Sequence, residues 1–351
     1  MGRVPMMGSV FRVMRALRRF RAAISGPVIF RRSGKRDELG RAASSLVRIR
    51  AMAAVVEIPD PRALRDEARA EIQRALDGGA ILSFPCFPIA IAAQDREFLL
   101  SLRQTRAAYH KNIAYRPAQE RVSGFTAGNP GGGVRLRDVL RRYSKSTIAF
   151  LGGLFPRYAA AWTVDYASFR RLEEAGRDLS ASKRNDRLHV DASPTRPTRG
   201  DRILRFFTNV NPENPRHWKT GSEVFPALAE RFARASGLLA KAERGGLVSR
   251  ARRWGAALGL PVAAHSAYDR FVLLFHDFLK SDDGYQRSAP ADEFRFPPGS
   301  SWMVYTDTVS HAVLSGRFAI EQTFRIARRS LAVPDRAPIA VLEKLAGRAL
   351  A

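Results

Sequence analysis

The chain has 351 residues, of which 45% are hydrophobic and 26% are charged, and these ordinary values for a globular protein exclude wholesale disorder. Lysine and arginine number 59 against 33 acidic residues, and the resulting net charge of +26 favours anionic partners such as nucleic acid, anionic lipid or an acidic substrate. The single cysteine, Cys86, excludes a disulfide framework and any metal site built from several cysteines.

Residues 1–51 form a basic N-terminal extension. Arginines alternate with apolar residues between Val10 and Ile24 at approximately helical spacing, and Gly26-Pro27 ends the pattern. Three interpretations are compatible with it: an amphipathic helix on an anionic membrane surface, an unstructured tail, and sequence that lies upstream of a start at Met52. Arginines interrupt any apolar core of the length that a secretory signal needs, and the longest uncharged stretch, residues 78–94, is too short to span a bilayer.

Residues 52–160 are predicted to be a helical supporting region. Asp60-Pro61 opens an amphipathic run with acidic residues in its early turns, and Gly78-Gly79 ends it. The segment 128–133 is rich in glycine, but no Lys-Ser or Lys-Thr pair follows it. We therefore interpret it as a loop before a helix and not as a phosphate-binding loop.

Residues 161–335 are predicted to be a catalytic core made of strands. A helical insert, residues 222–285, interrupts this core, and residues 336–351 predict a C-terminal helix. The fold class is therefore α+β: a double-stranded β-helix, or jelly roll, wrapped by helices. Four short runs of β-branched and aromatic residues predict the strands: WTVDYASFR, RILRFFTNVNP, SSWMVYTDTVSHAVLSG and RFAIEQTFRI.

A candidate metal site rests on His189, Asp191 and His311. Residues two apart on a strand face the same side, so His189 and Asp191 can share one ion, and a jelly roll returns a distal histidine such as His311 beside them. Two histidines and a carboxylate on one face of iron leave adjacent positions open for an oxoacid and dioxygen. The alternative is that both histidines are structural and hydrogen-bonded. A zinc hydrolase would also need a general base, and none is identifiable.

An oxoacid cosubstrate with a distal carboxylate also needs a cation, ideally an arginine that binds it through two nitrogens. Arg205 lies 16 residues after His189 and Arg325 lies 14 after His311, while Arg170 lies on the strand before the HxD motif. On the last strand Gln322 and Arg325 have opposite parity, so only one of them can face the interior.

Five longer segments resemble the Kdo hydroxylase family, whose members are iron(II)- and 2-oxoglutarate-dependent dioxygenases. These enzymes hydroxylate C3 of 3-deoxy-D-manno-oct-2-ulosonic acid (Kdo) in the inner core of lipopolysaccharide, on Kdo-lipid A. The resemblance spans roughly residues 55–330 and leaves out residues 1–50. The segments are HKNIAYRP (110–117), SFRRLEEAGR (168–177), RLHVDASPTRPTRGDRILRFFTNVNPENPRHWKTG (187–221), FHDFLKSDDGYQ (275–286) and SHAVLSGRFAIEQTF (310–324).

The resemblance implies a cofactor, Fe(II), with 2-oxoglutarate as cosubstrate and dioxygen as oxidant. The implied iron ligands are His189, Asp191 and His311, and the implied oxoglutarate ligands are Arg205, Arg170 and Gln322. Arg325 gains no support from it. The implied partners are a lipid-anchored Kdo saccharide and an anionic membrane surface, so the expected location is cytoplasmic and peripheral, on the inner face of the inner membrane.

Two basic segments are further candidates for anion binding. Lys111 and Arg116 are candidates for the sugar carboxylate, and a loop bearing Arg196, Arg199 and Arg202 is a candidate for phosphates or that carboxylate; simple solubility explains the loop equally well. Two other functions stay open: the same oxygenase chemistry on another small acidic or lipid substrate, and a non-catalytic jelly-roll binding protein. No nucleic-acid-binding signature is present, so no specific nucleic acid partner is expected.

Overall fold

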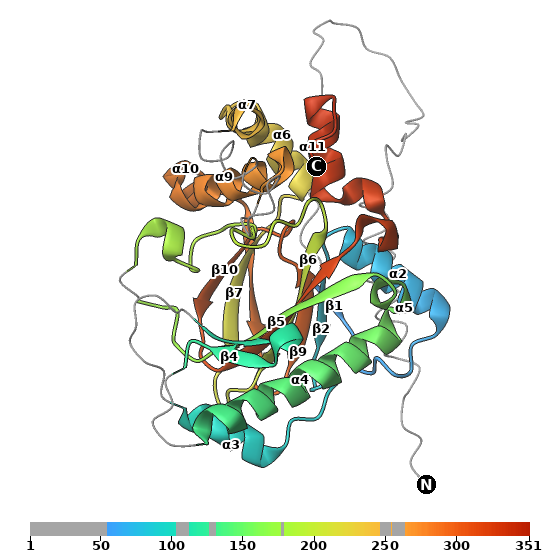
Figure 1. Cartoon of the computed structure of the whole chain (residues 1–351), viewed down its shortest axis with the longest axis vertical. Helices are drawn as coiled ribbons and strands as arrows, with labels where there is room; N and C mark the ends of the chain where they lie inside the picture. The colour runs from blue at the N-terminus through green and yellow to red at the C-terminus, as the bar shows by residue number, and fades with distance from the viewer. Residues whose placement is uncertain (1–54, 103–111, 126–130, 177–178, 246–253, 255–263) are drawn as a thin grey trace, which may run out of the picture.

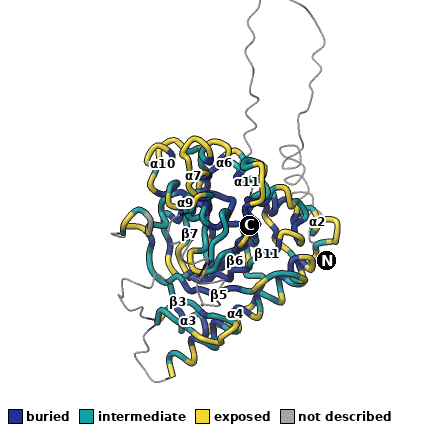
Figure 2. The backbone as a smooth tube through the Cα atoms, turned by 45° about the horizontal axis from the view of Figure 1, so that its top comes forward, coloured by how far each residue is buried: buried dark blue, intermediate teal, exposed yellow. Residues whose placement is uncertain are grey.

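The computed structural model describes residues 55–102, 112–125, 131–176, 179–245, 254 and 264–351 (Figure 1). The basic N-terminal extension, Lys111 and residues 128–130 of the glycine-rich segment lie outside these described residues. Two β-sheets form the centre of the molecule, with helices above and below them (Figure 1). Figure 2 shows the strands of the centre as largely buried, and the helices as exposed on their outer sides.

The larger sheet has eight strands in the order β1-β2-β9-β6-β11-β5-β3-β4, and the smaller has three in the order β10-β7-β8. Antiparallel pairing joins the four central strands, β9, β6, β11 and β5. Two mainly antiparallel sheets around a common centre make the jelly roll that the sequence predicts. The strands are β1 (Val55–Glu57), β2 (Ile81–Phe84), β3 (Ile113–Arg116), β4 (Arg121–Ser123), β5 (Trp162–Arg170), β6 (Arg202–Asn209), β7 (Arg216–Gly221), β8 (Ala291–Phe296), β9 (Ser301–Tyr305), β10 (His311–Ser315) and β11 (Ala319–Ile326).

The helices cover the sheets in two groups. Aromatic contacts from Phe150 to Phe84 and Phe206, at ring-centroid distances of 5.7 and 5.9 Å, pack α4 against the larger sheet. A capping box at Ser266 and Asp269 begins α9, and α6, α7, α10 and α11 lie near it at the opposite end (Figure 1). The helices are α2 (Asp66–Asp77), α3 (Ala93–Ser101), α4 (Gly132–Leu154), α5 (Pro156–Ala159), α6 (Phe225–Ala233), α7 (Leu238–Arg244), α9 (Ala267–Ser281), α10 (Asp283–Ser288) and α11 (Pro338–Ala346).

The four strand-rich runs identified in the sequence are confirmed as β5, β6, β9 with β10, and β11. The expectation of a helical region at 52–160 is wrong in part, because β1–β4 come from it and extend both edges of the larger sheet. Each of these strands has only three or four residues, too few to show a clear alternation in sequence. None of the helices in the described ranges combines the length and the apolar character that crossing a bilayer requires.

Candidate metal centre

His189 and Asp191 lie on an extended segment between β5 and β6 that pairs with the start of β10. His189 and His311 form an isolated antiparallel bridge, whose two backbone N–H···O bonds measure 3.1 and 2.8 Å. Directly opposed residues of an antiparallel pair project to the same side, and the two imidazole rings are 4.7 Å apart between centroids. The Asp191 N–H donates to the carbonyl of Thr306 at 2.7 Å, which helps to hold the carboxylate beside the His189 ring.

The backbone sets the tautomer of both histidines. Nδ1 of His189 lies 2.7 Å from the Arg187 carbonyl, and Nδ1 of His311 lies 2.8 Å from the Val309 carbonyl. Because a carbonyl only accepts, each Nδ1 donates its proton and each Nε2 presents a lone pair. His189 Nε2 is 3.6 Å from Asp191 Oδ1. Two neutral imidazoles and a carboxylate are the donors that non-haem iron(II) oxygenases use, so these residues fit an iron(II) ion.

Sequence reasoning missed a third histidine at this place, His276 on α9. Its Nδ1 donates to the Val190 carbonyl at 2.7 Å, and its ring meets that of His189 edge-to-face, with centroids 5.0 Å apart. Potential ligand atoms of His189, Asp191 and His276 all lie within 4.8 Å of one another. Among the described residues, this is the group of three possible ligands that lie so close together. His276 lies in the FHDFLKSDDGYQ segment, but helical spacing gives no sign that it reaches the HxD motif.

Burial and nearby charges keep the donors in the protonation states that a metal needs. Burial lowers the pKa of His189 to about 3 and also lowers the pKa of His311, so both rings are neutral at physiological pH. Burial by itself would raise the pKa of Asp191. The Arg205 guanidinium and the contact with His189 outweigh that effect and hold the pKa of Asp191 well below its usual range.

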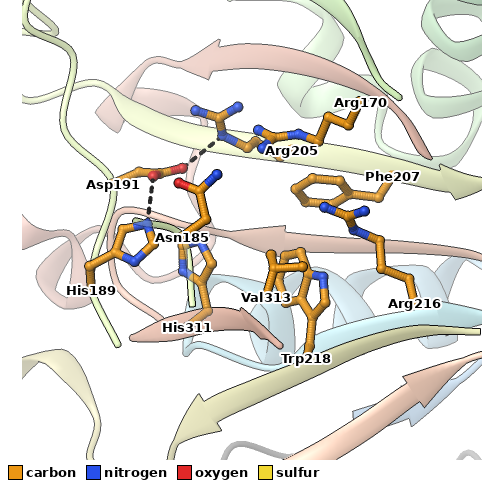
Figure 3. Close-up of a pocket in the computed structure, with 10 residues that line it drawn as sticks. All are labelled: Arg170, Asn185, His189, Asp191, Arg205, Phe207, Arg216, Trp218, His311 and Val313. Atoms are coloured by element: carbon orange, nitrogen blue, oxygen red, sulfur yellow. Dashed lines mark ion pairs between the residues drawn. The ribbon is translucent and has the colours of Figure 1, made fainter. Parts of the chain in front are cut away.

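A cavity of about 40 Å³ opens beside these donors, inside the jelly roll (Figure 3). His189, Asp191 and His311 line its wall, whereas His276 does not. Three arginines, an asparagine and apolar side chains complete the lining: Arg170, Arg205, Arg216, Asn185, Phe207, Trp218 and Val313.

Arg205 and Arg170 both line this cavity, as predicted, and both form ion pairs with the carboxylate of Glu321. Arg205 Nε lies 2.8 Å from Asp191 Oδ2, and its Nη1 pairs with Glu321. Arg170 Nη2 lies 2.6 Å from the other oxygen of Glu321. Asp191, Arg205, Glu321 and Arg170 thus form a row of alternating charges from the metal donors into the cavity. The carboxylates already engage Arg205 on two sides.

Gln322 is not brought to the cavity. In the β6–β11 register Gln322 lies opposite Phe206, which packs toward α4, whereas Thr323 lies opposite Arg205, which faces inward. The Gln322 side-chain amide donates to the Asp165 carbonyl at 2.7 Å. By the same alternation Arg325 faces the interior side, where it lines a second cavity next to the first.

Arg216 is the inward cation that sequence reasoning missed. It is 1% exposed, its Nη1 donates to the Gly316 carbonyl at 2.9 Å, and its Nε and Nη2 have no hydrogen-bond partner among the described residues. Burial and the neighbouring Arg170 lower the pKa of Arg216 to about 10. Strand alternation in RHWKTG, which takes Arg216 and Trp218 to one face, was the available signal.

The basic loop after the HxD motif is smaller than expected. Arg202 is fully buried in β6, where its Nε lies 2.9 Å from Asp307, so it is a structural ion pair and not a loop cation. Arg199 has a positive φ of 51° and is part of the turn into β6. Arg196 remains in the loop and lines the second cavity.

Comparison with known proteins comes to the same family. A family model described as 3-deoxy-D-manno-oct-2-ulosonic acid (Kdo) hydroxylase matches residues 61–349. A crystal structure of the Kdo hydroxylase KdoO, a non-haem Fe(II) α-ketoglutarate-dependent dioxygenase, in complex with α-ketoglutarate and Fe(III) is 33% identical, with a TM-score of 0.72 over 84% of this chain and 97% of that chain. Its cobalt(II) complex is 34% identical with a TM-score of 0.73 over the same shares. No curated protein matches the chain.

Proposed function

The chain belongs to the Kdo hydroxylase family, and we propose that it is an iron(II)- and 2-oxoglutarate-dependent dioxygenase that hydroxylates C3 of Kdo in the lipopolysaccharide inner core. One observation carries the proposal: a buried His-Asp-His set of donors lies at the wall of a cavity lined by three arginines. Fixed cations beside a metal site suit a dicarboxylate cosubstrate that binds the metal at one end and an arginine at the other.

His189, Asp191 and His311 would hold the iron. His311 is preferred over His276 because it lines the cavity and opposes His189 on the bridged strands, whereas His276 holds the intervening Val190 carbonyl from outside. Bound iron(II) supplies the redox chemistry by which 2-oxoglutarate and dioxygen yield succinate, carbon dioxide and the hydroxylated sugar. The protein's own part is to fix the donors, orient the diacid and exclude water.

Arg216 and Arg170 are the residues that we assign to the distal carboxylate of 2-oxoglutarate. Arg216 has two unused donors in a dry part of the cavity, and a carboxylate there would satisfy both. Arg205 has a different part in this proposal, because Glu321 holds it in place beside Asp191. It positions Asp191 through an ion pair with Oδ2, the carboxylate oxygen that His189 does not contact. Gln322 takes no part, since its side chain lies on the opposite face of β11.

We further propose that the protein works as a peripheral protein on the cytoplasmic face of the inner membrane, on a lipid-anchored Kdo saccharide. The net charge of +26 supports this proposal, because each lysine or arginine near an anionic leaflet contributes roughly 1 kcal/mol of attraction. Binding to anionic liposomes should be lost as the salt concentration rises to about 1 M, where the Debye screening length falls to roughly 3 Å. Retention at that salt would point to hydrophobic insertion and contradict electrostatic attachment.

The activity is tested by anaerobic reconstitution with iron(II), followed by oxygen and 2-oxoglutarate with and without Kdo-lipid A. Succinate release should rise with the lipid, and the Kdo sugar should gain one oxygen atom by mass spectrometry. His189→Ala, which removes a metal donor, should abolish both while the folded circular-dichroism spectrum persists. Succinate release that another acidic sugar stimulates and Kdo-lipid A does not would redirect the substrate assignment.

A further inference from the structure

A second cavity, of about 270 Å³, adjoins the metal centre. Arg170 and Arg205 line both cavities, so their side chains are the partition between them. We call this second space the outer chamber; β5, β11 and the loop after the HxD motif form its wall. Its lining comprises Asn112, Asp165, Tyr166, Ser168, Arg170, Ala192, Ser193, Pro194, Thr195, Arg196, Thr198, Ile203, Arg205, Glu321, Thr323 and Arg325.

The charges of the outer chamber do not cancel. Its lining holds four arginines but only two carboxylates, those of Asp165 and Glu321. Glu321 is already shared by Arg205 and Arg170, and Asp165 pairs with Arg196. The lining therefore carries an excess of positive charge, and a cavity with such an excess attracts an anion.

Arg196 is held in place on an aromatic surface. Its guanidinium carbon lies 3.7 Å from the centroid of the Tyr166 ring, and Arg116 approaches the same ring at 5.2 Å. The Nε of Arg196 is buried without a hydrogen-bond partner among the described residues. Burial and the nearby Arg325 lower the pKa of Arg196 to about 10, as expected where positive charge is incompletely compensated.

Arg325 lines the chamber from β11, the strand that pairs with β5. Among the described residues Arg325 forms no ion pair, its Nε is buried without a hydrogen-bond partner, and its hydrogen bond to the Pro197 carbonyl measures 3.4 Å. Arg196 and Arg325 line the same chamber, and each has a buried Nε that no described residue engages. An anionic group between them would receive charge-assisted hydrogen bonds from both.

We propose that the outer chamber binds the negatively charged group of the acceptor, a sugar carboxylate or a phosphate joined to it, through Arg196 and Arg325. This inference rests on the proposed function, because it places the acceptor next to the metal centre across the Arg170–Arg205 partition. It assigns to this chain a specific substrate-recognition site, and it makes Arg116 and Tyr166 the support that holds Arg196 in position.

The test measures binding and not turnover. Isothermal calorimetry on the full metal-free chain would use the sodium salt of Kdo in one series and inorganic phosphate in another. Arg196→Gln and Arg325→Gln should each weaken binding at least tenfold, as the loss of a hydrogen bond to a charged group implies, and Arg196→Lys should recover part of it. Arg348→Gln, at an arginine that lines neither cavity, is the control and should bind as the unaltered chain does.

The outcomes show separately which anionic group binds and whether the outer chamber binds an anion at all. Kdo binding that phosphate does not displace identifies the carboxylate as the ligand, and displacement by phosphate identifies a phosphate subsite; both support the chamber. Failure of both anions to bind, or unchanged binding in both glutamine variants with intact thermal unfolding, overturns it. Succinate release by the unaltered holoenzyme tests the proposed function separately, so either idea can fail while the other stands.

Discussion

Arg216 offers a perturbation whose effects on stability and on cosubstrate binding should have opposite signs. The change is Arg216→Met, which keeps much of the length of the side chain and removes its charge. In the metal-free protein this arginine is fully buried, with one hydrogen bond to Gly316 and two unused donors. We expect the variant to fold at least as stably as the unaltered chain, while its affinity for 2-oxoglutarate falls.

The expected magnitude follows from the environment of the guanidinium. Burial lowers the pKa of Arg216 from the ordinary arginine value to about 10, which corresponds to about 3 kcal/mol of unfavourable environment for the charge, at 1.36 kcal/mol per pKa unit. The Gly316 carbonyl loses its partner in the variant, which costs roughly 1–3 kcal/mol. The net change in the free energy of unfolding is therefore about zero to 2 kcal/mol in favour of Arg216→Met. Loss of a charged hydrogen bond to the diacid costs roughly 1.5–3 kcal/mol, or about ten- to a hundredfold in affinity.

Urea denaturation of the metal-free protein measures the first effect. The second is measured with iron(II) and 2-oxoglutarate under anaerobic conditions, where a ligand that binds only the folded state raises the melting temperature. The unaltered chain should show this rise at concentrations of 2-oxoglutarate that leave Arg216→Met unchanged. A variant destabilised by more than about 2 kcal/mol with unaltered 2-oxoglutarate affinity would refute the assignment and make Arg216 structural.

Three further predictions concern the metal donors and the turn behind Arg216. His311→Ala should weaken iron(II) binding more than about a hundredfold in an anaerobic titration, and His276→Ala about tenfold, because groups behind a ligand contribute less than the ligand itself; the reverse order would place His276 in the coordination shell. Burial lowers the pKa of His189 to about 3, so below about pH 6.5 this histidine binds a proton in the unfolded chain but not in the native state. The free energy of unfolding of the metal-free protein should therefore fall as the pH drops from 7 to 5, and it should fall less steeply in His189→Gln. Equal slopes in the two proteins would contradict this. Gly316→Ala should cost about 1–3 kcal/mol in urea denaturation, since φ is +116° and a Cβ there would lie 2.9 Å from the Arg216 backbone; an unchanged midpoint would mean that the turn adapts without strain.

The parts of the fold that the sequence predicted are those with strong local patterns. Runs such as WTVDYASFR are rich in β-branched and aromatic residues, and the HxD motif places His189 and Asp191 on one side of the chain whatever surrounds them. The bridge between His189 and His311 could be anticipated because the order of the runs fixes the jelly-roll connection. The edge strands β1–β4 were missed because three or four residues carry too little pattern to outweigh neighbouring helices.

The side-chain assignments around the metal needed tertiary information. Parity shows that Gln322 and Arg325 face opposite ways, but only the pairing of β11 with Phe206 of β6 tells which one faces inward. His276 reaches the centre from a helix, so no spacing rule links it to the HxD motif. The position of Arg216 could have been predicted, because it lies two residues before Trp218 in a short strand and therefore on the same face. In a chain so rich in arginine, however, a single arginine is easy to overlook.

Two arginines, Arg170 and Arg205, line both cavities, and both are ion-paired with the single carboxylate of Glu321. The positions of both arginine side chains therefore depend on that carboxylate. A neutral residue at position 321 would release Arg170 altogether and leave Arg205 with Asp191 alone. The two side chains that line both cavities would then no longer be held by a common carboxylate, and the boundary between the cavities would lose its fixed position.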